Sequence, residues 1–335
     1  MSAFSMTAAR LEPCTTAQPV TGIRSAASIG VARYCERLAA ALAALGVDYA
    51  LAEHALPGRA SHFHLANSSR RSIPQAMRAD RFAVSLHDVA PRTRALAPLY
   101  RTLVYPHVVG RSAVTIVHSR FAADLLLRLG GRPRRLEVVP HSAPRPRLLD
   151  RAAARAALGL ADNQLLAVQP GVIKSAKLVR ETVAAFGSGS VHPEWRLVLA
   201  GPVRDPAGAT EARRTGAFVL EHPDDPTYEA AIVAADVVLC LRSGSVGETN
   251  GPLLDALGAG RPVLATATGS IPEVAGNAAH YVQPTAAAIA DGLNALSDED
   301  ERARLGQTAR TRGAELSWES SAAAHAQLIA EVFCA

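Results

Sequence analysis

The segment LRSGSVGETNGPLLDALGAGRPVLATATGSIPEV (residues 241–274) joins the end of an apolar strand, a loop rich in Gly and Ser, and the start of a helix. Pro252 suits the first helical position, because its missing N–H group would have no helical partner there. Asn250 or Gly251 is then the expected cap, so free N–H groups and the positive end of the helix dipole meet at this loop. The segment therefore predicts a phosphate-binding site at the carboxyl edge of a parallel sheet.

Two carboxylates, Glu248 and Asp255, flank this loop. Carboxylates beside a phosphate loop are costly unless something polar binds them, which favours a binding site over a plain turn. A pair of acids can also serve a glycosidase as acid and base. Their position around a phosphate loop argues against that alternative.

Short apolar segments alternate with helical patterns on both sides of this loop, which is typical of parallel α/β layers. Strands are predicted at residues 82–88, 113–119, 135–142, 165–171, 195–201, 217–222, 236–242 and 262–268. Among the helices, one is predicted to begin after a Ser119 cap, and another runs from Ser28 or Gly30 to Gly46. Residues 9–20 contain two prolines and are a poor candidate for a buried parallel strand.

The chain of 335 residues is too long for one ordinary core and long enough for two domains. Residues 141–164 contain two prolines and no strand pattern, which indicates a linker followed by a short helix. We therefore predict a first domain over residues 1–150 and a second over residues 151–316. The last segment, residues 317–335, is predicted to be a helix that crosses back to the first domain.

Charge is divided unevenly along the chain. Residues 1–150 contain 20 basic and nine acidic residues, for a net charge of +11, whereas residues 151–335 contain 15 and 21, for a net charge of −6. Either the two domains simply have different surfaces, or the first meets an anionic partner such as a phosphorylated acceptor or a membrane surface. Nucleic acid fits less well, because the arginines are dispersed among apolar segments without an aromatic stacking platform.

The sequence also bears on the location of the protein. No apolar run reaches the roughly 18–20 residues that cross a bilayer, and the first ten residues lack the apolar segment of a signal peptide. The four cysteines are scattered, with neither a Cys-x-x-Cys pair nor metal-ligand spacing. A reduced, cytoplasmic location is therefore expected, with peripheral association at the inner face of the membrane left open.

The two lysines of the chain lie in one loop. Of 35 basic residues, 33 are arginine, and both Lys174 and Lys177 fall in PGVIKSAKLVRETVAAF (residues 170–186), after a strand and before a helix. In a chain so biased toward arginine, this placement indicates either that a compact ammonium group is needed there or a chance clustering of two residues.

Residues 80–335 resemble the retaining glycosyltransferases of family 4, which have the GT-B fold. The resemblance also includes HDVAPRT (87–93), VHSRFAADLL (117–126) and SWESSAAAHAQLIAEVF (317–333). The residues that match the family's C-terminal motif are Glu248, Gly251, Asp255, Ala256, Gly258, Gly260, Pro262, Val263, Gly269, Pro272 and Glu273. This chain departs from the pattern in having six rather than seven residues between the two acids, Asp as the second acid, and Asn250 in place of Ser.

The resemblance implies an α/β protein of two facing Rossmann-like domains, with a nucleotide-sugar donor in the cleft between them. It implies three catalytic residues: Glu248 on the sugar hydroxyls, Lys177 on the diphosphate, and His87 near the reacting carbon. Positive charge on the departing diphosphate lowers the barrier to breaking the glycosidic bond. The other expected donor-binding residues are Gly30, Lys174, Arg242, Thr249, Asn250, Gly251 and Asp255, the last on the ribose. The expected acceptor-side residues are Arg24, Asn67, Arg70, Arg71 and Asp88.

The resemblance further implies a retaining transfer of a sugar from a UDP- or GDP-sugar to an acceptor hydroxyl, in glycan, glycolipid or natural-product biosynthesis. No metal or other cofactor is expected, because basic residues and helix amides meet the diphosphate. Two alternatives remain open: a GT-B-fold epimerase or phosphorylase, and a protein that binds a sugar nucleotide without catalysis.

Four further histidines are given structural interpretations. His62 and His64 are not read as metal ligands, because no acidic residue or Cys stands beside them in the sequence. His118 and His141 follow predicted strands and are expected to line the cleft wall or to cap backbone groups.

Overall fold

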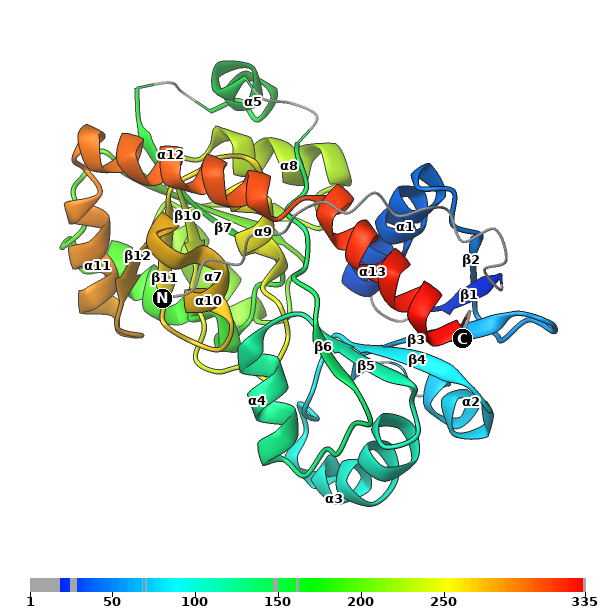
Figure 1. Cartoon of the computed structure of the whole chain (residues 1–335). Helices are drawn as coiled ribbons and strands as arrows, with labels where there is room; N and C mark the ends of the chain where they lie inside the picture. The colour runs from blue at the N-terminus through cyan, green and yellow to red at the C-terminus, as the bar shows by residue number, and fades with distance from the viewer. Residues whose placement is uncertain are drawn as a thin grey trace.

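The structure is a computed structural model that describes residues 19–24, 29–67, 69, 71–146, 150–160 and 163–333. It contains two parallel sheets of six strands each, flanked by helices (Figure 1). The predicted α/β class is therefore confirmed. The N-terminal residues up to 18, Ser28 and Arg70 lie outside the described residues.

The first sheet has the strand order β2-β1-β3-β4-β5-β6. Its strands are β1 (Val20–Ile23), β2 (Tyr49–Ala52), β3 (Ala60–Leu65), β4 (Phe82–Leu86), β5 (Val114–Val117) and β6 (Leu136–Val138). The predictions for β4, β5 and β6 are confirmed. Neither β2 nor β3 was predicted. In β3 the apolar pattern is interrupted by buried polar residues, among them Ser61, His62 and His64.

Helices cover both faces of this sheet. They are α1 (Ile29–Ala44), α2 (Ser72–Arg78), η1 (Arg94–Leu96), α3 (Ala97–Leu99), the π-helix η2 (Tyr100–Val109) and α4 (Arg120–Arg128). The predicted cap of α4 is confirmed, since the Ser119 hydroxyl accepts a hydrogen bond from the N–H of Ala122 at 3.1 Å. α1 begins at Ile29, between the two starts expected from the sequence.

The second sheet has the order β12-β11-β10-β7-β8-β9. Its strands are β7 (Leu165–Pro170), β8 (Trp195–Gly201), β9 (Phe218–Glu221), β10 (Val237–Cys240), β11 (Val263–Thr266) and β12 (Ala279–Val282). All but β12 were predicted. The surrounding helices are α5 (Arg151–Ala157), η3 (Ser175–Lys177), α6 (Val179–Gly187), α7 (Pro206–Arg214), α8 (Asp225–Ala234), α9 (Gly251–Gly258), α10 (Ile271–Ala275), η4 (Gly276–Ala278), α11 (Ala286–Ala295) and α12 (Glu299–Glu315).

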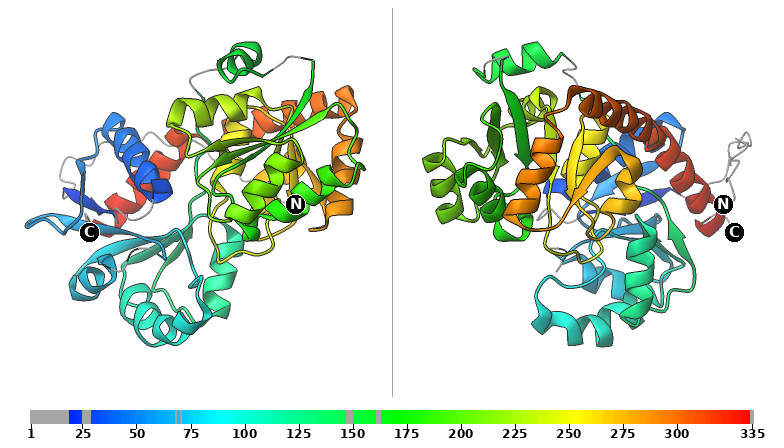
Figure 2. Two further views of the ribbon diagram at one scale, coloured as in Figure 1. Left: turned by 180° about the vertical axis from the view of Figure 1, so that it is seen from behind. Right: turned by 90° about the vertical axis from the view of Figure 1, so that its left-hand side faces the viewer.

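The chain passes between the two sheets twice. The last helix, α13 (Trp318–Phe333), follows α12 and lies against α1 of the first sheet in all views (Figures 1 and 2). Its apolar residues join the core under α1. The two crossings are bound together, because the N–H of Ala143 donates to Leu316 O at 2.7 Å and the Ser142 hydroxyl donates to Ser317 O at 3.1 Å. No helix in the described part of the chain has the length and apolar character of a membrane span.

A buried ion-pair network anchors α5 to the second sheet. Arg155, whose side chain is 1% exposed, donates to Asp236 at 2.5 Å, and Arg151 donates to the other carboxylate oxygen at 2.8 Å. The same carboxylate accepts the N–H of Leu166 at 2.7 Å, at the start of β7. One acid just before β10 thus holds α5, β7 and β10 together.

This network predicts a stability effect. Asp236→Asn would remove the negative charge that pairs with the buried Arg155 guanidinium at 2.5 Å, so the free energy of unfolding should fall by about 3 kcal/mol. Urea unfolding followed by tryptophan fluorescence measures the change, and Asp291→Asn, at an exposed position of α11, is the matched control. Equal stability of the two variants would show that the ion pair does not contribute.

Candidate active site

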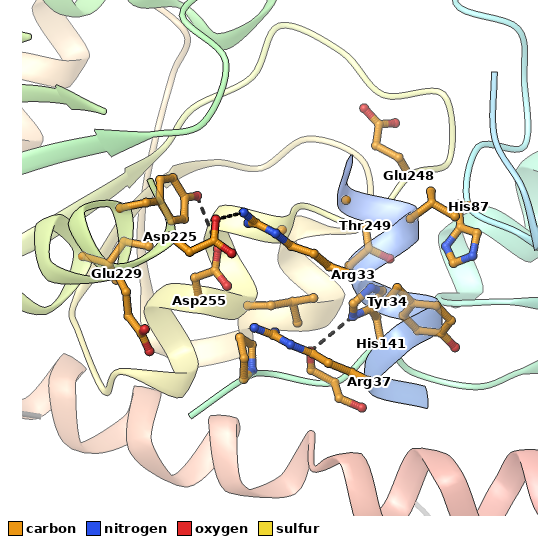
Figure 3. A pocket seen from close by; sticks show the side chains of 18 of the residues that line it. Arg33, Tyr34, Arg37, His87, His141, Asp225, Glu229, Glu248, Thr249 and Asp255 are labelled. Atoms are coloured by element: carbon orange, nitrogen blue, oxygen red, sulfur yellow. Dashed lines mark hydrogen bonds and ion pairs between the residues drawn. The ribbon is translucent and has the colours of Figure 1, made fainter. Parts of the chain in front are cut away.

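A cavity of about 390 Å³ lies between the two sheets, at the carboxyl ends of their strands. α1 and the loop after β4 line one side, whereas the loop after β10, α8 and α9 line the other (Figure 3). The charged residues that line it are Arg33, Arg37, Asp88, Arg92, Arg145, Asp225, Glu229, Arg242, Glu248 and Asp255. Both domains therefore contribute charge of both signs to one site.

The amino end of α9 opens onto this cavity. Asn250 is the N-cap by its backbone angles, but its side chain makes no capping hydrogen bond, and its buried Oδ1 has no partner among the described residues. Thr249 and Gly251 line the cavity, and the space beside the Cα of Gly251 is open. An uncapped helix start with small residues around it is suited to an anion.

Glu248 is buried, with 7% of its side chain exposed, although it lies in a loop. One carboxylate oxygen pairs with Arg242 and lies 3.6 Å from Arg92, and the other accepts from the Ser245 hydroxyl at 2.9 Å and the Val246 N–H at 2.7 Å. Burial opposes the charged form, but Arg242 and these donors outweigh it and hold the pKa of Glu248 below its usual range. Glu248 is thus an ionised carboxylate held in a fixed position.

Asp255 lies one turn into α9 and lines the same cavity. The Tyr228 hydroxyl of α8 donates to its Oδ2 at 3.3 Å. Burial raises the pKa of Asp255 to about 6, against the attraction of Arg37 and Arg33 on α1. This carboxyl therefore differs from Glu248, since its surroundings disfavour the charged form.

The lysine loop lies next to the start of α9 but does not line the cavity itself. The Lys177 ammonium donates to Pro170 O at 3.0 Å and fills the space that a side chain at Gly171 would need, with the Pro252 ring beside the same space. Burial lowers the pKa of Lys177 to about 7, with Arg242 adding to the effect. Lys174 is half-buried, and burial followed by Arg92 and Arg242 lowers its pKa as well.

On the first-domain side, His87 and Asp88 directly follow β4 and line the cavity. Asp88 accepts from the N–H of Asn67 at 2.8 Å and from Arg92 at 2.7 Å. The Asn67 side chain donates to Ala90 O at 3.0 Å and accepts from the N–H of Arg92 at 2.9 Å. Asn67 therefore shapes the loop after β4 rather than facing the cavity.

Backbone contacts join this loop to the second domain. The N–H groups of Val89 and Ala90 both donate to Val246 O at 2.9 Å. Gly247, at φ +90°, leaves no room for a side chain, because a Cβ there would lie 2.7 Å from that of Val89. The loop that carries Glu248 is thus positioned directly against the loop that follows His87.

Two other residues that were expected on the acceptor side lie away from the cavity. Arg24 pairs with Glu36 on α1, and Arg71 is exposed at the start of α2. Neither lines the cavity. Arg70, the remaining acceptor-side candidate, lies outside the described residues. Of the predicted donor-side residues, Gly30 does line it, on the first turn of α1.

The arginines that do reach the site were missed by sequence reasoning. Arg33 and Arg37 project from α1 toward the second domain, and Arg33 pairs with Asp225 on α8 (Figure 3). Their spacing of four residues, just after the Gly-rich segment, places them on one helix face and was the available signal. Arg92, in the HDVAPRT segment, also lines the cavity.

Residues 150–312 match the family model for glycosyl transferases group 1. Over these residues the chain is similar to the glycosyl transferases of group 1. The matched segment contains Lys174, Lys177, Arg242 and the loop from Glu248 to Asp255, so it includes the second-domain side of the cavity.

One similar protein is the MMP alpha-(1->4)-mannosyltransferase of Mycolicibacterium hassiacum, with 28% identity over 218 residues. The match covers 62% of this chain and 51% of the relative, so it spans about half the length of that protein. Both the domain match and this relative support a glycosyltransferase class of enzyme.

Solved structures resemble nearly the whole chain. Sucrose-phosphate synthase from Thermosynechococcus elongatus superposes with a TM-score of 0.74 at 18% identity, covering 95% of this chain and 99% of that one. Anabaena HepE in complex with UDP superposes with a TM-score of 0.76 at 13% identity, covering 93% and 100%. At these identities the likeness shows the fold, and the predicted GT-B architecture is confirmed.

The lowered pKa of Lys177 predicts pH-dependent nucleotide binding. A diphosphate favours the charged ammonium, so the affinity for UDP should fall as the pH rises above about 7, by up to about tenfold per pH unit. Lys177→Arg remains protonated, and its UDP affinity should stay nearly constant between pH 7.5 and 9. Isothermal titration calorimetry of both proteins checks this, and parallel pH profiles would remove Lys177 from the diphosphate site.

Proposed function

We propose that this protein is a retaining glycosyltransferase that moves a sugar from a UDP- or GDP-sugar to an acceptor hydroxyl. The observation that carries the proposal is the uncapped amino end of α9, which opens onto a cavity between two domains and faces His87 across it. The segment that is similar to the glycosyl transferases of group 1 supplies that helix. The UDP-bound HepE structure shares the fold, which supports a nucleotide donor on the second-domain side.

The leaving group of such a transfer is the nucleoside diphosphate. The first N–H groups of α9 and the Lys177 ammonium would stabilise the negative charge that develops on its oxygens. Asp255, at the cavity wall, is the candidate for the ribose, and Glu248 for the sugar hydroxyls. Basic side chains and helix amides thus take the place of a metal ion in this proposal, which calls for no cofactor.

The arrangement of Glu248 bears on the stereochemical course. Both its oxygens already accept hydrogen bonds or ion pairs, from Arg242, Ser245 and Val246. A carboxylate held in this way is a poor nucleophile, which argues against a covalent glycosyl intermediate on Glu248. We therefore propose same-face attack: the bond from the sugar to the phosphate oxygen breaks, the acceptor oxygen bonds to the same carbon, and the departing phosphate takes the acceptor's proton.

Two measurements test the activity. UDP or GDP should raise the melting temperature, and the matching sugar nucleotide should release its nucleotide with a suitable acceptor. Glu248→Gln should reduce kcat by about 100-fold while leaving nucleotide affinity within a few-fold, because it changes the sugar contact and not the diphosphate contact. Glu211→Gln, at a partly exposed acid on α7 that also pairs with an arginine, Arg214, is the control.

Three outcomes would count against this function. Nucleotide binding without release in the presence of any acceptor would favour the non-catalytic binding protein. Isomerisation of the sugar nucleotide, or phosphate-dependent cleavage, would favour the epimerase or phosphorylase. A melting temperature strongly lowered by Glu248→Gln would indicate that the buried Glu248–Arg242 pair is structural.

We propose in addition that the acceptor is anionic. Arg33, Arg37 and Arg92 come to the cavity from the first domain, whose segment has a net charge of +11. Arg37 is exposed and forms no ion pair with any described residue. A phosphorylated or lipid-diphosphate-linked sugar matches this charge, and the lipid-linked form would bring a cytoplasmic protein to the inner face of the membrane.

The charge predicts a salt effect on the acceptor. Exposed charges are screened beyond roughly 8 Å at physiological salt, so acceptor KM should rise with ionic strength, whereas donor KM, set by enclosed contacts, changes less. Arg37→Gln should raise the KM of a phosphorylated acceptor about tenfold and reduce its salt dependence. Steady-state kinetics from roughly 20 to 500 mM NaCl, a range over which the screening length falls several-fold, check this. Arg196→Gln, at an exposed position, is the control. A preferred acceptor that is neutral would contradict it.

A further inference from the structure

Six histidines from distant parts of the sequence gather behind the cavity. They are His62, His64, His87, His118, His141 and His325. All but His141 are less than 9% exposed, and consecutive rings lie 4.3–6.0 Å apart. His87 and His141 reach the cavity wall beside Tyr34 (Figure 3).

Backbone carbonyls fix the proton position on three of the rings. The Nδ1 atoms of His118, His141 and His325 lie 2.9, 3.2 and 2.8 Å from the carbonyl oxygens of Val139, Ser142 and Ser321. A carbonyl oxygen only accepts, so each of these Nδ1 atoms carries the hydrogen. Burial lowers the pKa of all three below its usual value, which keeps the rings neutral.

The proton positions on the other three rings depend on one tyrosine hydroxyl. Tyr49 Oη lies 3.0 Å from Nδ1 of His62 and 2.8 Å from Nε2 of His64. His64 Nδ1 then lies 3.3 Å from Nε2 of His87, and His62 Nε2 lies 2.9 Å from the Ser85 hydroxyl. A continuous chain of hydrogen bonds therefore connects Tyr49 to the ring at the cavity wall.

Gly22 makes this chain possible. Tyr49 is on β2 and the histidines are on β3, with β1 between them in the sheet. A Cβ at Gly22 on β1 would lie 2.5 Å from the hydroxyl oxygen and ring of Tyr49. Only the missing side chain lets the tyrosine ring extend across β1.

A single proton decides the state of the three rings. Burial lowers the pKa of His62, His64 and His87 well below its usual value, so each neutral ring has one donor and one acceptor nitrogen. If Tyr49 donates to His62, then His64 donates to Tyr49 from Nε2 and accepts from Nε2 of His87. If Tyr49 donates to His64 instead, every ring reverses. The first arrangement gives all three rings the Nε2–H form that free histidine side chains prefer.

We propose that Tyr49 and His64 are positioning residues that hold His87 as the Nε2–H tautomer, with Nδ1 presented to the cavity as a hydrogen-bond acceptor. Nδ1 of His87 has no protein partner within the described residues, and His87 lines the cavity. On the basis of the proposed glycosyl transfer, Nδ1 accepts a hydrogen bond from a hydroxyl group of the bound sugar or acceptor. A ring of the opposite tautomer would present a donor and lose this contact.

Nitrogen-15 NMR of protein labelled at the histidine rings tests the tautomers without any activity. Signals are assigned with single His→Gln variants. In the native protein, His62, His64 and His87 should show the Nε2–H pattern, whereas His118 and His325 should show Nδ1–H and serve as internal references. Tyr49→Phe removes the hydroxyl and should shift His64 and His87 toward a mixture of tautomers. An Nδ1–H pattern at His87 in the native protein, or an unchanged pattern in Tyr49→Phe, would overturn the proposal.

Enzyme kinetics provide a second test of the role of Tyr49. Tyr49→Phe should lower kcat at least about tenfold with donor KM within about twofold, because the tautomer acts on the bound complex and not on the diphosphate contacts. Ser112→Ala is the matched control, since it also removes a buried hydroxyl with two partners, Val109 O and Thr115, from the other end of β5. An unchanged kcat beside altered tautomers would overturn the role in transfer. If no transfer is found at all, the glycosyltransferase proposal fails and the NMR result still decides the tautomer assignment.

Discussion

The amino end of α9 faces the cavity without a side-chain cap, and the charged residues around it are placed where they do not cap it. Glu248, the nearest acid, is turned toward Arg242 and backbone donors and does not cap the helix. Asp255 shares a hydrogen bond with Tyr228 and has a raised pKa, and Lys177 has a lowered one. Each residue on the proposed donor side thus avoids competing with a phosphate for the helix end.

The first domain completes the cavity at this helix end. Contact is made by backbone as well as by side chains, through Val89 and Ala90 on Val246. Arg92 then joins Asp88 of its own domain to the Glu248 carboxylate of the other. The linker and α13 cross side by side, so both connections between the domains leave at one place. Movement of one domain against the other would open or close the cavity while leaving each sheet intact.

The polar interior of the first domain gives its cavity wall a defined chemistry. Buried histidines are costly unless their nitrogens are satisfied, and here carbonyls satisfy some rings while Tyr49 links others. The network also reduces the apolar content of the first sheet, because His62 and His64 occupy buried positions of β3. In return, a ring at the cavity wall has a defined orientation and proton position.

The sequence alone determined the layered α/β fold, most strands, the cap of α4 and the Gly-rich turn before α9, because these depend on local apolar patterns and on backbone groups that need capping. It also indicated a family through motifs spread over residues 80–335. Only the tertiary structure decided which side chains meet: Arg33 and Asp225, 192 positions apart, pair across the cavity, and Glu248 proved buried although its loop is polar. Such partners follow from how the two domains and their strand ends come together, and no local pattern encodes that arrangement.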